Sequence, residues 1–306
     1  MDLSNVKWYF LAVLGVFFWS FNVIVSRYLL GVLYPWQIAF IRWVIAALIL
    51  LPFTYKDIWQ HRRAYIKHWK WVLALSFFGI ALSNTFVYIA GYTVTAVEMS
   101  LIQVTGPIFL IVFSRLAGII TISNKQRLGF LLCTIGVVTI ILHGRFMDLG
   151  KLHLQIGDFW MLLTAITFGY YSYLMTKKPP EVGQMSLLSL TVVIGTIICI
   201  PLFIYDTYLN PFTSQNVTWT TFGIMIYMGL FNSVLAYLCW NTALDKLDSV
   251  KVGMVYYTMP IFSTIAAYFI LHEEIYTAQL WGGLLILAGI FLTNQKKRRK
   301  LIFERP

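Results

Sequence analysis

Residues 105–136 of the chain read TGPIFLIVFSRLAGIITISNKQRLGFLLCTIG, and residues 258–289 read TMPIFSTIAAYFILHEEIYTAQLWGGLLILAG. The second stretch begins 153 positions after the first, and the two align without a gap. The shared residues of the first stretch include Thr105, Pro107, Ile108, Phe109, Ile122, Gln126, Gly129, Leu132 and Gly136, which recur as Thr258, Pro260, Ile261, Phe262, Ile275, Gln279, Gly282, Leu285 and Gly289. A duplicated block of apolar helices predicts a transporter whose two halves enclose a site.

The composition predicts an all-α integral membrane protein. Hydrophobic residues make up 59% of the 306 positions and charged residues only 11%, whereas soluble domains have about 45–50% and about 25%. A helix needs about 20 apolar residues to cross a hydrocarbon core of ~30 Å. The sequence offers such windows at 7–28, 35–54, 70–92, 95–117, 126–143, 157–176, 185–205, 219–243, 249–271 and 276–294.

These ten windows predict two repeats of five transmembrane helices, spanning residues 1–146 and 147–295, followed by a basic tail at 296–306. Because five is an odd number, the second repeat enters the membrane from the opposite face, and the repeats have inverted topology. Such a pair has two nearly equivalent arrangements, one open to each side. Two such arrangements are the minimum that alternating access requires.

The net charge of +11 is distributed unevenly between the two sides of the predicted membrane. Arg27, Arg145 and Lys151 lie on one side. The basic segments on the other side contain Lys56, Arg62, Arg63, Lys67, Lys70, Lys125, Arg127, Lys177, Lys178, Lys246, Lys251 and residues 296–300, KKRRK. The positive-inside bias therefore predicts a multi-pass protein of the inner (plasma) membrane with both termini in the cytoplasm. The tail is interpreted as a membrane anchor, so the lipid bilayer and a small-molecule substrate are the expected partners and nucleic acid is not.

Patterns for catalysis, cofactor binding or metal binding do not occur in the sequence. Cys133, Cys199 and Cys239 lie in apolar windows without CxxC spacing, which is typical of small buried residues. No HExxH, P-loop or Ser/His/Asp pattern is present. The chain is therefore expected to be no enzyme and to need no cofactor or metal. A proton is a candidate coupling ion that the sequence does not specify.

Polar side chains inside the windows are candidate substrate contacts, because an uncompensated charge at the bilayer centre costs about 2.5–3.5 kcal/mol on insertion scales. Arg42 is the basic residue deepest in a window; it either meets a substrate carboxylate, snorkels, or pairs with a neighbouring helix. Asn232 is a further polar residue of the eighth window. The other predicted substrate-binding residues are Trp19, Asn22, Asn84, Tyr88, Gln103, Tyr170, Tyr173, Tyr237 and Asn241. For each polar residue the alternative role is an interhelical hydrogen bond.

Pro107 and Pro260 occupy equivalent positions inside the fourth and ninth windows. A proline there removes one backbone hydrogen bond and kinks the helix. The pair is a candidate hinge set for gating, with packing as the alternative. Gly129 with Gly136, and Gly282 with Gly289, are seven residues apart and predict faces that allow close approach of another helix.

Several short motifs together resemble the drug/metabolite transporter superfamily, in its EamA family. They are Trp19-Ser20-Phe21-Asn22, Pro35 followed by Ala39-Phe40-Ile41-Arg42, Pro107 and Pro260, Gly157-Asp158, and His272-Glu273-Glu274-Ile275-Tyr276. The resemblance covers nearly the whole chain. It implies ten helices, a central cavity, and usually export of amino acids or related metabolites. Glu273 departs from repeat symmetry, since Ile120 is its counterpart, and it is predicted to act locally at the end of the ninth helix.

The predicted function is therefore secondary active transport, as an exporter of amino acids, related metabolites or drugs. One alternative within transport is uptake or exchange of a cofactor such as S-adenosylmethionine, which the superfamily includes. An alternative from another class is a membrane receptor or assembly factor. The small share of the chain outside apolar windows argues against that class.

Overall fold

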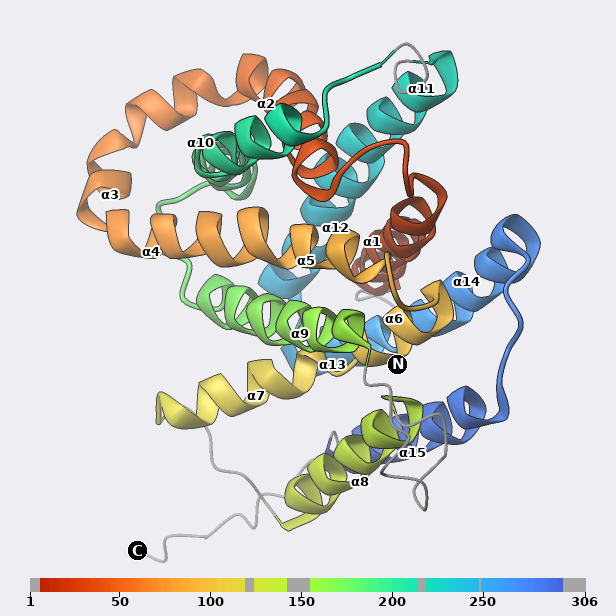
Figure 1. Ribbon diagram of the computed structural model, residues 1–306. Helices are drawn as coiled ribbons and strands as arrows, with labels where there is room; N and C mark the ends of the chain where they lie inside the picture. The colour runs from red at the N-terminus through yellow and green to blue at the C-terminus, as the bar shows by residue number, and fades with distance from the viewer. Residues whose placement is uncertain (1–5, 119–123, 142–154, 214–217, 248, 294–306) are drawn as a thin grey trace, which may run out of the picture.

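The chain forms an all-helical bundle (Figure 1). A computed structural model describes residues 6–118, 124–141, 155–213, 218–247 and 249–293. Ten helical segments and one short linking helix account for the regular structure of these residues, and none of them is a strand. The first five segments are α1 (Val6–Tyr28); α2 (Pro35–Gln60); α4 (Trp69–Leu75) with π-helix η2 (Ser76–Leu82) and α5 (Ser83–Ala90); α6 (Ala96–Gln103) with α7 (Gly106–Leu116); and α8 (Asn124–Ile141).

The second five segments repeat this order. They are α9 (Ile156–Met175); α10 (Gln184–Leu209); α11 (Trp219–Tyr227) with π-helix η4 (Met228–Leu235) and α12 (Ala236–Lys246); α13 (Ser249–Tyr256) with α14 (Met259–Ala266) and π-helix η5 (Ala267–Leu271); and α15 (Thr277–Thr293). Six described helical spans are long and apolar enough to cross a membrane. The predicted all-α membrane fold with ten helices is confirmed. The linking helix α3 (Arg62–Lys67) was not predicted.

The fourth and ninth segments are interrupted at equivalent places. Pro107 is in the first turn of α7, and Pro260 is in the first turn of α14. Proline is tolerated in a first turn because the amide hydrogen it lacks has no partner within the helix. A proline nitrogen carries no hydrogen, so neither proline can donate to the carbonyl four residues earlier, at Gln103 or Tyr256. For this reason α6 and α7 do not form one continuous helix, and neither do α13 and α14.

The third and eighth segments carry matching π-helices, η2 and η4. A π-helix widens the backbone and leaves carbonyls free for other donors, and such segments often occur at functional sites. The carbonyl of Gly79 in η2 accepts a bond from the Tyr237 hydroxyl at 2.9 Å, and that of Asn232 in η4 accepts one from Trp19 Nε1 at 3.1 Å. Gly79 and Asn232 are 153 residues apart, so both repeats use this device at the same position.

Contacts between equivalent residues mark the pseudo-twofold axis that relates the repeats. Three hydrogen bonds join residues separated by 153 positions: Asn84 Nδ2 to Tyr237 Oη at 2.8 Å, Gln103 Nε2 to Tyr256 Oη at 3.1 Å, and Cys133 Sγ to the Ile286 carbonyl at 3.4 Å. A residue can touch its own counterpart only near the axis that relates them. The axis therefore passes between the third and eighth, fourth and ninth, and fifth and tenth segments.

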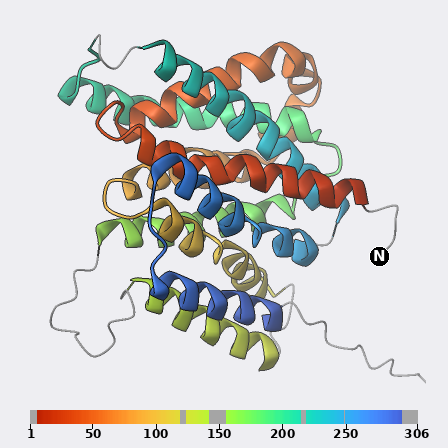
Figure 2. The same ribbon diagram turned by 90° about the vertical axis from the view of Figure 1, so that its right-hand side faces the viewer.

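Helices α8 and α15 lie side by side at one edge of the bundle (Figures 1 and 2). Their glycines face each other, as the seven-residue spacing predicted. A Cβ atom added at Gly136 would lie 2.6 Å from the Gly282 carbonyl oxygen, and one added at Gly289 would clash with the Gly129 carbonyl oxygen. Backbone therefore packs directly on backbone here, which only glycine permits.

Replacing Gly136 with alanine is expected to destabilise the protein by about 1–3 kcal/mol, because the new methyl group forces α8 and α15 apart. The measurement is the thermal unfolding midpoint of purified protein in detergent. The matched control is Gly223→Ala in α11, where an added Cβ meets no atom of the described residues within 4 Å. This control should unfold at or above the wild-type temperature. Equal midpoints for Gly136→Ala and wild type would show that the two helices separate without cost.

Candidate functional site

A small polar pocket lies where the two repeats meet. Its volume is about 10 Å³, close to the space that one water molecule needs. Its lining comes from six helices of both repeats, α1, α5, α6, α9, α12 and α13. The lining residues are Trp19, Asn22, Ser83, Asn84, Gln103, Thr164, Phe168, Tyr237 and Tyr256. The pocket contains two of the three hydrogen-bonded pairs on the pseudo-twofold axis. The pocket therefore lies on the pseudo-twofold axis that relates the repeats.

Arg42 lies in α2 beside this pocket and is completely buried. Its Nε donates to Ser233 Oγ at 2.9 Å, and its Nη1 donates to Asn22 Oδ1 at 3.1 Å and to the Tyr88 hydroxyl. The guanidinium stacks on the Trp43 ring, with 4.4 Å from Cζ to the ring centroid. All of these partners are neutral, so they solvate the positive charge without cancelling it.

The remaining guanidinium nitrogen, Nη2, is buried and has no hydrogen-bond partner among the described residues. Arg42 also takes part in none of the ion pairs among the described residues. A buried charged donor without a partner is costly. An anionic ligand group is the natural complement of such a donor, because a guanidinium binds carboxylate through two parallel bonds.

Aromatic rings form one wall of the pocket. The Trp19 ring lies 5.3 Å from that of Phe168, 5.1 Å from that of Tyr237 and 5.5 Å from that of Trp240, measured between centroids. Phe168 also stacks on Tyr256 at 5.3 Å. These side chains leave an apolar surface facing the amides of Asn22, Asn84 and Gln103. The combination suits a solute with an apolar body and a polar head.

The structure brings together most of the predicted site residues. Trp19, Asn22, Asn84, Gln103 and Tyr237 line the pocket. Arg42 and Tyr88 bond to Asn22 behind it. Asn241 lies one layer away and donates to the Tyr171 hydroxyl at 2.9 Å. Asn232 is fully buried, and neither polar atom of its side chain has a partner among the described residues.

Two of the predicted tyrosines lie elsewhere. The Tyr170 ring packs on Phe78 and Phe113, at 4.9 and 5.0 Å. The Tyr173 ring contacts Phe113 at 6.4 Å and lies under Lys177 Nζ at 4.5 Å. On α9 the face toward the pocket instead carries Phe168 and Thr164, with Tyr171 one turn further on. Tyr170 and Tyr173 therefore lie on a face of α9 other than the one that lines the pocket.

Five contributors were not predicted: Ser83, Thr164, Phe168, Ser233 and Tyr256. Tyr256 had a usable signal, because it is the repeat counterpart of Gln103, and Gln103 was a candidate. Ser233 had no such signal. It bonds to Arg42 and also donates to the Met228 carbonyl at 3.0 Å, five residues earlier, which depends on the π-helical backbone of η4.

A second polar cluster joins the repeats at the end of the molecule where α1 finishes and α6 begins. Glu273 follows η5 and accepts hydrogen bonds from the backbone amides of Ala96, at 2.9 and 3.1 Å, and Val97, at 3.3 Å. Arg27 Nε donates to the same carboxylate at 3.3 Å, and Arg27 Nη1 donates to the Gly91 carbonyl at 2.8 Å. We call these residues the Glu273 clamp. The carboxylate is favoured at the amino end of α6 by the helix dipole.

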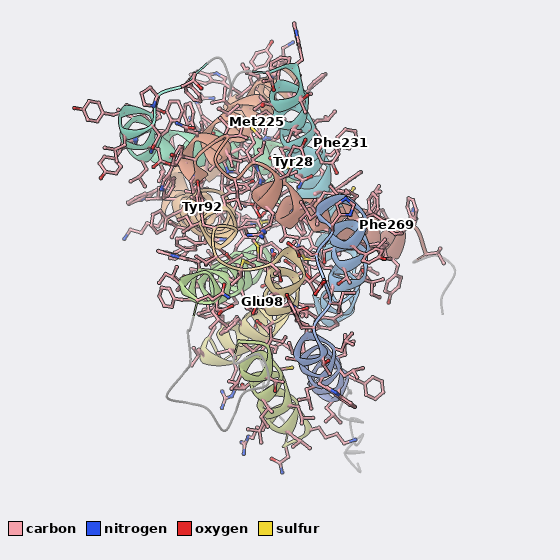
Figure 3. The ribbon with its side chains drawn as sticks, turned by 45° about the vertical axis from the view of Figure 1, so that its right-hand side comes forward. Tyr28, Tyr92, Glu98, Met225, Phe231 and Phe269 are labelled. Atoms are coloured by element: carbon pink, nitrogen blue, oxygen red, sulfur yellow. The ribbon has the colours of Figure 1, made fainter. Side chains whose placement is uncertain are left out.

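The clamp corrects the prediction that Glu273 acts locally at the end of the ninth helix. Its side chain joins the second repeat to two helices of the first. Gln279 Nε2 adds a bond to Thr95 Oγ1 at 3.3 Å, just before α6. Figure 3 labels Tyr92, which precedes α6, and Glu98, which lies in its first turn; Tyr92 is exposed and Glu98 is buried.

Comparison with known proteins identifies the family. The model of the EamA-like transporter family matches residues 6–142 and again residues 155–295. The chain belongs to this family. An uncharacterized transporter of Archaeoglobus fulgidus is 27% identical over 300 residues, which cover 96% of this chain and 100% of the relative. The uncharacterized transporter YyaM of Bacillus subtilis is 24% identical, over 90% of this chain and 88% of the relative.

The EamA-like transporter fold also agrees with a solved structure. A crystal structure described only as that of a protein matches with a TM-score of 0.61, over 94% of this chain and 97% of that chain, at 15% identity. This likeness shows the fold alone. The protein is accordingly a multi-pass membrane transporter, and each family match contains one of the two helix interruptions that flank the pocket.

Proposed function

We propose that this transporter exports small metabolites or drugs that carry an anionic group, with amino acids as the expected class. The observation that carries the proposal is Arg42, a buried guanidinium beside the central pocket with a free Nη2. A substrate carboxylate would complete its hydrogen bonding and neutralise its charge. The aromatic wall around Trp19 would hold the apolar side of the substrate.

The proposed orientation places both termini in the cytoplasm, on the basis of the charge asymmetry of the loops. The Glu273 clamp then lies at the outer end of the bundle. A reporter that is active only outside the cytoplasm should be silent when fused after Lys300. Activity of that fusion would reverse the orientation and, with it, the assignment of outer and inner ends.

Alternating access in this scheme opens and closes the clamp. The clamp joins the repeats on one side, and the pocket of about 10 Å³ has no room for a solute in this arrangement. In the proposed orientation, this arrangement corresponds to a state in which the centre is closed from outside. Rocking of the repeats about the pseudo-twofold axis would break the clamp and open the pocket outward.

Transport of amino acids is the direct test. Inverted and right-side-out membrane vesicles containing the protein receive a mixture of the twenty radiolabelled proteinogenic amino acids. Export predicts accumulation in the inverted vesicles above the level in vesicles with equal amounts of Arg42→Met protein. Accumulation only in right-side-out vesicles would favour uptake, and no difference from Arg42→Met in either orientation would refute the proposal.

Pro107 and Pro260 are the proposed hinges. Pro107→Ala or Pro260→Ala supplies the amide hydrogen that could join the two halves of its segment into one helix. Because the repeats are inverted, the two changes should bias the protein toward opposite access states. The measurement is labelling of a single cysteine at Ser83, in the pocket, by an impermeant maleimide from each side. Wild-type labelling and transport in both variants would assign the prolines to packing.

A further inference from the structure

A second cavity, of about 250 Å³, opens at the end of the bundle opposite the Glu273 clamp. It is formed by the end of α9, the start of α10 and the end of α12, and its lining consists of Met175, Thr176, Lys178, Gln184, Asn241, Leu244 and Asp245. We call it the inner vestibule. In the proposed orientation it faces the cytoplasm.

The inner vestibule presents charges of both signs. Lys178 Nζ lies 3.8 Å from Asp245 Oδ1, which is a long distance for an ion pair, and Nζ also donates to the Val182 carbonyl at 3.0 Å. Asp245 is also held by Lys246 on its other side, at 3.2 Å. The ammonium and the carboxylate are therefore near each other without being closely paired, and each retains capacity for a further partner.

The inner vestibule also contains one amide group, that of Gln184, whose hydrogen bonding is unsatisfied among the described residues. Both Gln184 Oε1 and Gln184 Nε2 are buried and lack a hydrogen-bond partner among the described residues. Buried polar atoms without partners are uncommon in folded proteins, and a ligand or ordered water is their usual explanation. The amide can donate to an anionic group and accept from a cationic one, so it complements Lys178 and Asp245.

The inner vestibule lies against the central site. Asn241 belongs to its lining and donates to the Tyr171 hydroxyl at 2.9 Å. The Tyr171 ring lies 5.9 Å from that of Tyr237, which lines the central pocket. Tyr171 and Asn241 therefore form the partition between the two spaces. A solute in the vestibule is one side-chain layer from the centre.

We propose that the inner vestibule is a binding site for a small zwitterion, which holds the cytoplasmic substrate before it passes the Tyr171–Asn241 partition. The anionic group of the solute binds Lys178, its cationic group binds Asp245, and the Gln184 amide contacts either. The proposal rests on the proposed export function and adds a first site on the substrate's route. The volume of about 250 Å³ is below the ~300–1,000 Å³ typical for drug-sized ligands, and so fits a solute of amino-acid size.

Protection of an introduced cysteine tests the site without knowledge of which zwitterion is native. Thr176→Cys is placed in the vestibule of full-length protein whose Cys133, Cys199 and Cys239 are alanine. Its rate of labelling by a maleimide is measured in detergent, with and without an equimolar mixture of the nineteen proteinogenic amino acids other than cysteine, whose thiol would itself consume the maleimide. The mixture should slow labelling at least threefold. The matched control is Glu181→Cys, an exposed residue outside the lining, whose labelling rate should not change.

Charge variants test whether Lys178 and Asp245 bind the solute that protects Thr176→Cys. Lys178→Met or Asp245→Asn should abolish the protection of Thr176→Cys. Lys246→Met removes a charge beside the same aspartate but outside the lining, and should leave the protection intact. Absence of protection in the parent, or protection that survives both Lys178→Met and Asp245→Asn, overturns the proposal.

The vestibule and the transport function can fail separately. Amino-acid flux that depends on Arg42, without protection of Thr176→Cys, would overturn the vestibule site and leave the proposed function standing. Protection that requires Lys178 and Asp245, without amino-acid flux, would support the site and overturn the export assignment.

Discussion

Arg42→Lys is expected to lower transport at least tenfold while the yield of folded protein stays near that of wild type. Lysine keeps the positive charge but lacks the planar fork that now holds Asn22, Tyr88 and Ser233 and leaves Nη2 for a ligand. Hydrogen bonds to charged groups are worth about 1.5–3 kcal/mol each, and 1.4 kcal/mol is a factor of ten. The measurement is initial flux in proteoliposomes with equal amounts of protein.

The control for this prediction is Ser233→Ala. It removes the acceptor of Nε but leaves Nη1 bound and Nη2 free, so it should lower transport much less than Arg42→Lys does. Arg42→Met removes the charge and should be at least as inactive as Arg42→Lys. A structural role for Arg42 would appear differently: Arg42→Lys and Arg42→Met would lose folded protein equally, and the protein that remained would transport normally.

The helices could be predicted from the sequence because lipid imposes a strong pattern. In a hydrocarbon core every backbone group must be bonded internally, so each long apolar window becomes a helix. The observed α2 begins at Pro35 and α9 begins at Ile156, which agree with the predicted starts of 35 and 157 to within one residue. The duplicated Pro107 and Pro260 predicted a kink in two segments, and the structure has a break between helices just before each proline.

The rotation of each helix was harder to predict. Most faces of a membrane helix are apolar, so periodicity does not tell which face meets the centre. Tyr170 and Tyr171 are adjacent in sequence, yet Tyr170 packs on Phe113 and Tyr171 bonds to Asn241. The π-helices η2 and η4 add to the difficulty, because an i→i+5 backbone rotates the residues that follow.

The Glu273 clamp could not be predicted from the sequence, for another reason. Its bonds depend on tertiary contacts between segments separated by 246 and 177 residues. Two of the donors to its carboxylate are the backbone amides of Ala96 and Val97, whose side chains carry no sign of the interaction. Repeat symmetry offered no help either, since the counterpart of Glu273 is Ile120, which lies outside the described residues.

Glu273→Gln is expected to open the central pocket to the outside. The substitution keeps the length of the side chain but replaces one acceptor oxygen with an amide donor, which faces either the Arg27 guanidinium or the amides of α6. It also removes the negative charge from the amino end of α6. A cysteine at Ser83 should therefore be labelled by an impermeant maleimide from the outer side at least ten times faster, which corresponds to a shift of about 1.4 kcal/mol in the access equilibrium.

Glu274→Gln is the matched control for the clamp, because Glu274 is the exposed neighbour and has no ion pair or hydrogen bond to the first repeat among the described contacts. It should label like wild type. Arg27→Gln should resemble Glu273→Gln, and the double variant should exceed neither by much, since removal of either partner breaks the same bond between the repeats. If Glu273→Gln lowers the unfolding temperature but leaves labelling of Ser83→Cys unchanged on both sides, the clamp stabilises the fold without gating it. If the two single changes add fully, Arg27 and Glu273 act independently, and the contribution of Glu273 then comes from its bonds to the amides of Ala96 and Val97.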